Sequence, residues 1–546
     1  MIEKYIGKTK TVSKINGYVC HSIYDPIKEA KLFVDKNKED VQIHFIYGYG
    51  DGYIVEEFLN RLEDNETYYI VIDPFIDISM KKSPNAIFIN YIDVINLKED
   101  IEKFVDWQYN RKLTLSPNYD KMDLEKYQLF LKMFNEINHL SNVNANTISL
   151  RAEEWYKNYL FNMKYLLKDK SLAEMKNSTN KPVVVASGGP SLTKQLPYLK
   201  RYRSSILLIA AGSTVNSLIA ADIIPDIVVS IDGHINNYKH FEKIIFNEKV
   251  KFFYTMYSYF KIREKFKEGY YFLDSISSNL CKHLECLTNE SSIAIEGGGS
   301  VAHFSLNIAT YISTGPVALI GQDLAYTNGK SHAENNIFIK SINLKDENFI
   351  EIEGYNNEKV YTDYMFLSMK KTFEELIKVL DKTRIYNCTE GGALLKGYQN
   401  KKFEDFCKES TTIKDLQTKK TKSVVNNKQK SLKVIKENIA IYERLLRITK
   451  QNLYLLQSNK KTANFSKETL KKLDSNDKRM KELCKDNPIE TAFRAVDLHV
   501  NRSFKKMKYE TPQQEYERVY NQNEYLYSEM NRFAKIGKEI LTSIIK

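Results

Sequence analysis

The first residues able to do chemistry are small and polar ones that follow a buried apolar run at residues 181–192 (KPVVVASGGPSL). They are Ser187, Gly188, Gly189, Pro190 and Ser191. Glycine lets a ligand approach the backbone, and proline suits the first turn of a helix. The free N–H groups of such a turn, with the positive end of the helix dipole behind them, bind anions such as phosphate.

Comparable small or polar residues recur near further predicted strands. They are Gly212 and Ser213 after residues 206–211, Asp232 after residues 226–231, Gly298, Gly299 and Ser300 before a helical pattern, and Gln322, Asp323, Tyr326 and His332 after residues 317–320. Open α/β sheets bind ligands at the carboxyl ends of their strands. The first turn matches neither the dinucleotide nor the P-loop fingerprint, and taken by itself it could be only a tight connection. The recurrence favours a ligand site.

These residues need a sheet to position them. The β-branched run at residues 183–185 is typical of a parallel strand covered on both faces. At 546 residues, two or three domains are expected. The sequence predicts an α/β protein with a Rossmann-like N-terminal domain (1–145), a central α/β domain with a mostly parallel sheet (146–400) and a C-terminal α-helical domain (401–546).

Helices dominate the predicted connector and the C-terminal domain. Residues 146–176 carry apolar residues at helical spacing, and so do residues 432–456. A last helix is expected to begin at Thr511, with Pro512 at its first position and Gln514 completing a capping box.

A second glycine turn lies in the N-terminal domain. The strand at residues 43–47 runs into Gly48, Gly50 and Gly52, and a second strand ends in Asp73, where a dinucleotide fold places its ribose-binding acid. The glycine spacing departs from the dinucleotide pattern. Whether this turn binds a ligand stays open at this stage.

Composition excludes several classes of protein. The net charge is +12, but much of the excess lies on C-terminal helices where acids alternate with lysines, so nucleic-acid binding is not expected. No apolar segment reaches the roughly 20 residues that span a bilayer, and the start lacks a secretory apolar region. Six scattered cysteines suit reduced thiols, so we expect a cytoplasmic protein. Cys281, His283 and Cys286 lack a second ligand pair, so no metal is expected.

Five motifs in order resemble the motility-associated factor (Maf) glycosyltransferases, which modify flagellin. They are ASGGPSL, PDIVVSID, EGGGSVAHFSLNIA, GQDLAYTNGKSHA and NCTEGGALLKG, over residues 181–397. The same core is similar, more distantly, to the bacterial sialyltransferases of glycosyltransferase family 42, and it resembles the MptE-like pterin diphosphokinases. The resemblance implies transfer of a nonulosonic acid, such as pseudaminic or legionaminic acid, from its CMP-activated donor to Ser or Thr of flagellin, with no cofactor.

The resemblance also implies roles for residues. Tyr326 and His332 match the loop that contacts the leaving phosphate. The donor and its nucleotide are expected at residues 187–191, Gly212, Ser213, Asp232, residues 298–300 and Gln322, with Thr389 and Glu390 of the last motif. No Asp-x-Asp pair follows the strands, so a metal-independent reaction is expected.

The general base is not identified by sequence. The histidine that the sialyltransferases place before a later helix has no counterpart here, which leaves Asp232, His234, Asp323 and Asp363 as candidates. Two other functions stay open. One is an ATP- and Mg²⁺-dependent pterin diphosphokinase with Asp232 and Asp323 as metal ligands. The other is a non-catalytic scaffold or chaperone for flagellin.

Overall fold

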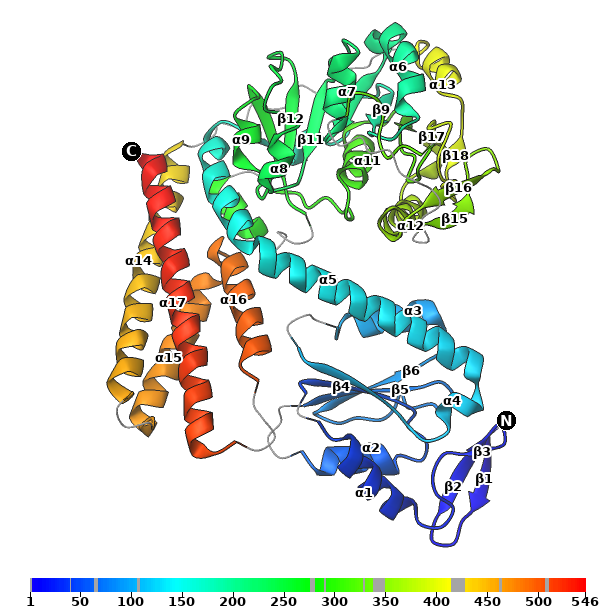
Figure 1. Ribbon diagram of the computed structural model, residues 1–546, viewed down its shortest axis with the longest axis vertical. Coiled ribbons are helices and arrows are strands. Elements are labelled where there is room, and N and C mark those ends of the chain that lie inside the picture. Colours follow the sequence, from blue (N-terminus) through cyan, green and yellow to red (C-terminus); the bar gives the residue numbers. More distant parts are fainter. Residues whose placement is uncertain are drawn as a thin grey trace. The chain divides into compact units, whose positions relative to one another are not determined.

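The computed structural model describes most of the chain as two compact units. The described residues are 2–39, 41–62, 67–105, 109–274, 280–288, 291–327, 329–336, 349–413, 428–460, 464–505 and 510–546. The first unit combines Met1–Leu150 with Arg494–Leu526, and the second combines Arg151–Phe493 with Tyr527–Lys546 (Figure 1). The division at residues 145 and 400 stays a prediction.

The first unit contains a four-stranded parallel sheet with helices on both faces. The sheet has the order β6 (Ala86–Asn90), β5 (Tyr68–Asp73), β4 (Ile43–Tyr47), β7 (Arg111–Leu115). Phe45 and Tyr47 enter one core and Ile46 enters another, because successive side chains of a strand point to opposite faces. This explains why β4 is apolar throughout.

The remaining elements of the first unit surround this sheet or extend from it. They are the antiparallel strands β1 (Ile2–Ile6), β2 (Thr11–Ile15) and β3 (Tyr18–Val19), and the helices α1 (Pro26–Asn37), α2 (Tyr53–Asn60), α3 (Val94–Glu102) and α4 (Tyr119–Met122). The chain passes into the second unit within α5 (Leu124–Asn162). The predicted connector helix therefore starts well before residue 146.

The second unit is built on a nine-stranded sheet in which every pairing is parallel. Its order is β18 (Gln399–Asn400), β17 (Ile385–Asn387), β14 (Val317–Ile320), β9 (Val183–Ala186), β10 (Leu207–Ala211), β11 (Ile227–Ser230), β12 (Lys251–Thr255), β13 (Glu268–Phe272), β8 (Lys170–Ser171). A separate antiparallel pair joins β15 (Ile350–Glu353) to β16 (Lys359–Thr362). The predicted parallel sheet is confirmed.

The strand order reverses at β9. From β9 the chain adds β10 to β13 on one side, and then returns to place β14 on the other side. Such a reversal opens a crevice at the carboxyl ends of the central strands, which is where open α/β sheets bind ligands. Helix α11 (Val301–Ile312) packs across β9, β10, β11 and β14. The carboxyl ends of β9, β10, β11 and β14 and the N-terminus of α11 therefore meet at one edge of the sheet.

Helices complete the second unit. Those that connect strands are α6 (Leu192–Arg201), α7 (Thr214–Ala220), α8 (Ile235–Tyr238), α9 (Phe260–Arg263), α10 (Cys281–Thr288) and α12 (Tyr364–Val379). Those that follow the sheet are α13 (Phe403–Ser410), α14 (Lys428–Asn459), α15 (Lys467–Cys484), α16 (Ile489–Ser503) and α17 (Pro512–Ile545), the last two shared with the first unit.

The predicted start of the last helix is confirmed. The N–H of Thr511 donates to Oε1 of Gln514 at 2.9 Å, and the N–H of Gln514 donates to Oγ1 of Thr511 at 3.2 Å. These are the two reciprocal hydrogen bonds of a capping box. Pro512 occupies the first helical position.

One buried ion pair anchors the β8 edge of the large sheet. The Arg263 guanidinium binds the Asp169 carboxylate, and each side chain is 1% exposed. The Tyr254 hydroxyl also donates to Asp169, at 2.8 Å. The pair joins the segment before β8 to β12 and to α9.

Asp169→Ala should lower the free energy of unfolding by roughly 3–5 kcal/mol, because it leaves the Arg263 charge buried without a counterion. Urea unfolding followed by the fluorescence of Trp155, which stacks on Tyr257 in the same unit, would measure the change in a Trp107→Phe background, because the chain has two tryptophans. The matched control is Glu264→Gln, which breaks the exposed Lys164–Glu264 pair and should cost less than about 1 kcal/mol. Equal, small effects of the two variants would contradict the prediction.

Candidate active site

A cleft of about 320 Å³ lies at the carboxyl ends of β9, β10, β11 and β14. Its polar lining comes from the loop after each of these strands and from the start of α11. The residues predicted from sequence that line it are Ser187, Gly188, Gly189, Gly212, Ser213, Asp232, Ser300, Gln322, Asp323 and His332. Leu324, Ala325, Met365, Phe366 and Met369 form an apolar part of the wall. The fold thus brings together most of the residues expected to bind a donor.

The first turn is held closely against the loop after β14. The Ser187 hydroxyl donates to Oε1 of Gln322 at 2.6 Å, and the Gly189 N–H donates to the Gly321 carbonyl at 2.8 Å. The Gly188 carbonyl accepts from the N–H of Ala333 at 2.9 Å. A Cβ on Gly188 would lie 3.2 Å from Nδ2 of Asn336 and 3.8 Å from the His332 ring. Gly188 is therefore the point where the turn faces the His332 loop.

The predicted helix start at this turn is wrong in two respects. Helix α6 begins at Leu192, so Pro190 precedes it. The Ser191 N–H is not free: it donates to the two Asp323 carboxylate oxygens at 3.1 and 3.2 Å, and the Ser191 hydroxyl donates to one of them at 2.6 Å. A carboxylate of the chain thus occupies the place where we expected a phosphate, because a buried helix end needs its donors satisfied.

Asp323 is accordingly committed to internal hydrogen bonds. It is 1% exposed and also accepts from the Thr327 hydroxyl at 2.9 Å. Burial raises the pKa of its carboxyl, while the hydrogen bonds from Ser191 and Thr327 act in the opposite direction. This arrangement fits a structural cap.

The helix that presents its N-terminus to the cleft is α11. Ser300 caps it through a hydrogen bond from the Ala302 N–H to the Ser300 hydroxyl at 3.2 Å, and Ser300, Val301 and Ala302 all line the cleft. The helix has twelve residues, so its dipole favours negative charge at this end. Gly298 and Gly299 precede the cap and are not among the lining residues.

Two imidazoles line the cleft. His332 was expected, and Nδ1 of its ring lies 2.9 Å from the Ser331 hydroxyl. His240, which sequence reasoning missed, is 4% exposed, and its Nδ1 lies 3.2 Å from Nδ2 of Asn216. Burial and, secondarily, the charge of His332 lower the pKa of His240 to about 4. His240 is therefore neutral at physiological pH.

The third strand end carries an accessible carboxylate. Asp232 is exposed and lines the cleft, and one of its oxygens accepts from the His234 N–H at 2.9 Å. Asn237 lies beside it and donates to the Ser230 hydroxyl at 2.9 Å. His234 itself does not line the cleft; its Nδ1 accepts from the Asn236 N–H at 3.3 Å.

Tyr326 is not brought to the cleft lining. Its hydroxyl donates to Asp363 at 2.5 Å, and its ring contacts Phe349 and Phe366. Burial and then Asp363 raise the pKa of the Tyr326 hydroxyl. Asp363 in turn caps α12 by accepting from the Phe366 N–H at 2.7 Å. Tyr326 thus supports the helix that supplies the apolar part of the wall.

Thr389 and Glu390 lie behind the cleft. The Thr389 hydroxyl accepts from the Gln322 N–H at 3.3 Å, and its carbonyl accepts from Nε2 of Gln195 at 2.9 Å. Glu390 accepts from the Phe403 N–H at 3.3 Å. Neither residue is among those that line the cleft.

Sequence reasoning missed one polar group and one segment besides His240. Asn237 gave only a weak signal, as a polar residue five positions after Asp232. Met365, Phe366 and Met369 gave none, because their spacing is that of any amphipathic helix. Their place in the cleft depends on where α12 packs.

The N-terminal glycine turn is filled by the chain itself. Asp73 is 1% exposed, and one of its oxygens accepts from the N–H of Tyr49 at 2.8 Å and from the Tyr119 hydroxyl at 2.6 Å. A Cβ on Gly48 would lie 2.5 Å from the Tyr119 ring. Asp73 is therefore engaged internally and is not presented to a ribose.

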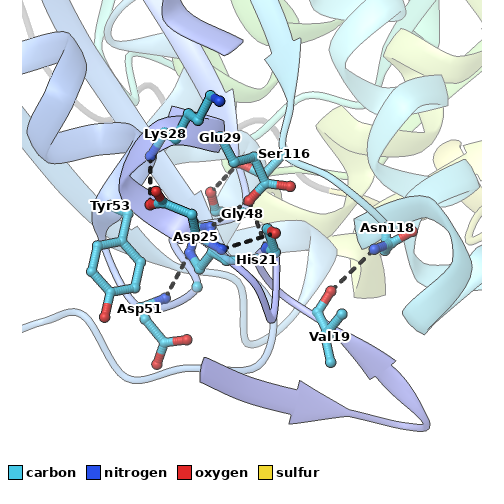
Figure 2. Close-up of polar contacts among 12 residues, drawn as sticks. Val19, His21, Asp25, Lys28, Glu29, Gly48, Asp51, Tyr53, Ser116 and Asn118 are labelled. Atoms are coloured by element: carbon cyan, nitrogen blue, oxygen red, sulfur yellow. Dashed lines mark hydrogen bonds and ion pairs between the residues drawn. The ribbon is translucent and has the colours of Figure 1, made fainter. Parts of the chain in front are cut away.

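Polar contacts tie this turn to the first strands of the chain. Figure 2 shows the Asp51 N–H donating to Nε2 of His21, at 3.1 Å, and the Ser116 hydroxyl donating to the Gly48 carbonyl, at 2.6 Å. His21 is 2% exposed. Together with Asp73, these bonds give the glycine turn a structural explanation.

Two comparisons with known proteins bear on the fold. Residues 157–329 match the family described as 6-hydroxymethylpterin diphosphokinase MptE-like. The solved structure of a Maf glycosyltransferase from Magnetospirillum magneticum AMB-1 is similar, with a TM-score of 0.61 and 10% sequence identity, over 100% of this chain and 92% of that chain. No curated protein matches. The likeness confirms the predicted fold class and, at the level of the fold, the resemblance to the Maf glycosyltransferases.

Two further structural findings concern membranes and metals. In the part of the chain that the structure describes, no helix has both the length and the apolar character needed to cross a bilayer. His283 of the cysteine–histidine cluster is buried, with Nδ1 at 3.0 Å from the Tyr159 hydroxyl and Nε2 at 3.0 Å from Nδ2 of Asn438. Both ring nitrogens of His283 are therefore within hydrogen-bond distance of buried side chains.

We expect His240 to titrate with a midpoint near 4, well below the ordinary value of 6.5. The pKa of His240 is lower in the folded state than in the unfolded state, so protonation of this group favours unfolding. The free energy of unfolding should therefore not depend on His240 above about pH 6.5, and it should fall as the pH drops toward 4. Histidine-labelled NMR spectra would measure this, with the His240 signal assigned by its loss in His240→Asn. A midpoint near 6.5 would contradict the burial argument.

Proposed function

We propose that this protein is a glycosyltransferase that moves a nonulosonic acid, of the pseudaminic or legionaminic type, from its CMP-activated donor to Ser or Thr of flagellin. One observation carries the proposal: a cleft rich in hydrogen-bonding groups lies at the strand-order reversal of a fold shared with a Maf glycosyltransferase. The donor carries a phosphate and a carboxylate. The cleft offers hydroxyl, amide and imidazole groups and a helix N-terminus to bind them.

The donor phosphate is assigned to the region between Gly188, His332 and the start of α11. Bond cleavage leaves negative charge on the phosphate of CMP, and hydrogen-bond donors placed there stabilise the transition state. His332 supplies such a donor, or a proton. Gln322 and Ser213 line the same cleft. The reaction forms a bond between the acceptor oxygen and the anomeric carbon while the bond from that carbon to the phosphate oxygen breaks.

Asp232 is the best supported general base. Among the four candidates, Asp323 and Asp363 each cap a helix, and His234 does not line the cleft. Asp232 is exposed and lines the cleft, and it retains oxygen lone pairs for the proton of an acceptor hydroxyl. Tyr326 is assigned a positioning role through Asp363.

The pterin diphosphokinase reaction is the second candidate, because a family of that description matches residues 157–329. That reaction would place Mg²⁺ on Asp232 and Asp323. The residues fit this ion poorly, since Asp323 gives its oxygens to Ser191 and Thr327 and leaves Asp232 as the remaining acid of the cleft lining. We therefore keep metal-independent transfer as the proposal.

Transfer from a CMP-nonulosonate to flagellin should continue in excess EDTA. Separately, His332→Ala should lower turnover by a factor on the order of 10². CMP release and the mass of flagellin would measure both. Lys330→Ala, on the same loop but outside the cleft lining, should leave turnover unchanged. Loss of transfer with EDTA, restored by Mg²⁺, would contradict the metal-independent reaction. Formation of AMP from ATP and 6-hydroxymethylpterin would support the kinase.

Gly188→Val should weaken CMP binding by at least about tenfold, because the added methyl groups would project toward Asn336 and His332. Gly188→Ala should have a smaller effect, since its Cβ would meet the Asn336 amide at 3.2 Å and that side chain can shift slightly. Titration calorimetry with CMP would measure both variants, and circular dichroism would verify their folding. Unchanged affinity in folded Gly188→Val would move the nucleotide away from this turn.

A further inference from the structure

A second concave surface is lined by residues of α14 and α15. Figure 1 labels these two helices, which contact each other in the second unit. It has a volume of about 850 Å³. Its lining, here called the basic groove, consists of Arg444, Arg447, Ile448, Lys450, Gln451, Tyr454, Arg479, Glu482 and Leu483. The groove shares no residue with the cleft at the sheet edge.

Four of the residues that line the groove are exposed cations. Within the described residues, no ion pair or hydrogen bond joins the side chains of Arg444, Arg447, Lys450 or Arg479 to another group. Elsewhere on the same helices, Lys472 lies 2.9 Å from Glu468 and Lys433 lies 3.9 Å from Glu437. Four cations and one acid, Glu482, thus line the groove.

The helical repeat explains why cations and apolar side chains of α14 line the same groove. Arg444, Ile448 and Gln451 recur at steps of four and three, so they share one face of α14 with Arg447 and Tyr454. Ile448 is buried and Leu483 is half-buried, whereas the ring of Tyr454 is 71% exposed. The lining therefore combines exposed cations with the exposed ring of Tyr454, the half-buried Leu483 and the buried Ile448.

We propose that the basic groove binds an acidic amphipathic helix of a partner protein. Two neighbouring helices form a groove into which a third helix can lay its apolar face, and carboxylates on that helix would reach the arginines. Arginine suits this role because its planar guanidinium binds a carboxylate through two parallel hydrogen bonds. The proposal rests on the groove alone and does not depend on glycosyl transfer.

Two other anionic partners fit the surface less well. A single-stranded nucleic acid needs aromatic rings for successive bases, and the groove has one, Tyr454. A membrane-binding helix projects its apolar residues outward, whereas Ile448 is buried in the lining of a concave surface. Both partners become outcomes of the test.

The test uses the full chain and a labelled peptide of about four helical turns, with leucines on one face and glutamates elsewhere. Fluorescence anisotropy should show saturable binding that weakens as the salt concentration rises. The double variant Arg447→Glu, Arg479→Glu reverses one charge on each helix and should weaken binding at least about tenfold. The control Lys433→Glu, Lys472→Glu makes the same change in net charge outside the groove and should have a much smaller effect. Circular dichroism and thermal unfolding would verify that all variants fold.

Three results would overturn the proposal. The first is absence of binding to the wild-type chain, and the second is equal weakening by the groove and control variants. The third is tighter, groove-dependent binding of an oligothymidylate or of phosphatidylserine vesicles than of the acidic peptide. A preference for the acidic peptide that is lost in the groove variant supports it.

Discussion

The hydrogen bonds between Asp323 and Ser191 hold the candidate active site together. Asp323 follows β14 and Ser191 precedes α6, so one carboxylate joins the loops of two neighbouring strands across the strand-order reversal. It caps α6 and accepts from Thr327 at the start of the loop that carries His332. The neighbouring bond from Ser187 to Gln322 also joins the loops after β9 and β14.

Glycines from three of the sequence motifs lie close to Asp323 or beside it in the chain, and this close packing gives them a structural role. A Cβ on Gly189 would lie 2.3 Å from an Asp323 oxygen, and one on Gly392 would lie 2.3 Å from the Asp323 carbonyl oxygen. Gly321 has a positive φ of 62°, and its Cβ would meet the Ser187 carbonyl at 2.2 Å. These glycines are needed because the chain packs against itself there. Gly188, which also lines the cleft, leaves more room for a Cβ than these three glycines.

Local patterns predicted the local structure well. The apolar run at residues 183–185 predicted a central parallel strand, and Thr511 with Gln514 predicted a helix start, because each depends on neighbours in the sequence. The strand ends indicated where the cleft would lie. The partner of a polar group was not predictable: nothing near Ser191 shows that its N–H meets a carboxylate 132 residues later.

The same limit applies to the other candidate residues. His240 enters the cleft from a short segment with no motif, and Tyr326 is turned away from it by Asp363, which lies 37 residues further along the chain. In the N-terminal unit, the position of Asp73 was predicted correctly, but its engagement by Tyr119 depends on tertiary packing. Residue types and spacing predicted that the site lies at the carboxyl ends of the strands. The hydrogen bonds in the structure show which polar side chains are engaged within the fold and which line the cleft.

The composition of the two units has a consequence for synthesis on the ribosome. The first unit takes its final segment from Arg494–Leu526, after nearly the whole second unit has been made. Its parallel sheet can form early, but the segment that completes it emerges late, while the second unit still waits for Tyr527–Lys546. Both units are therefore completed in quick succession, so a chain that stops before Arg494 leaves neither one whole.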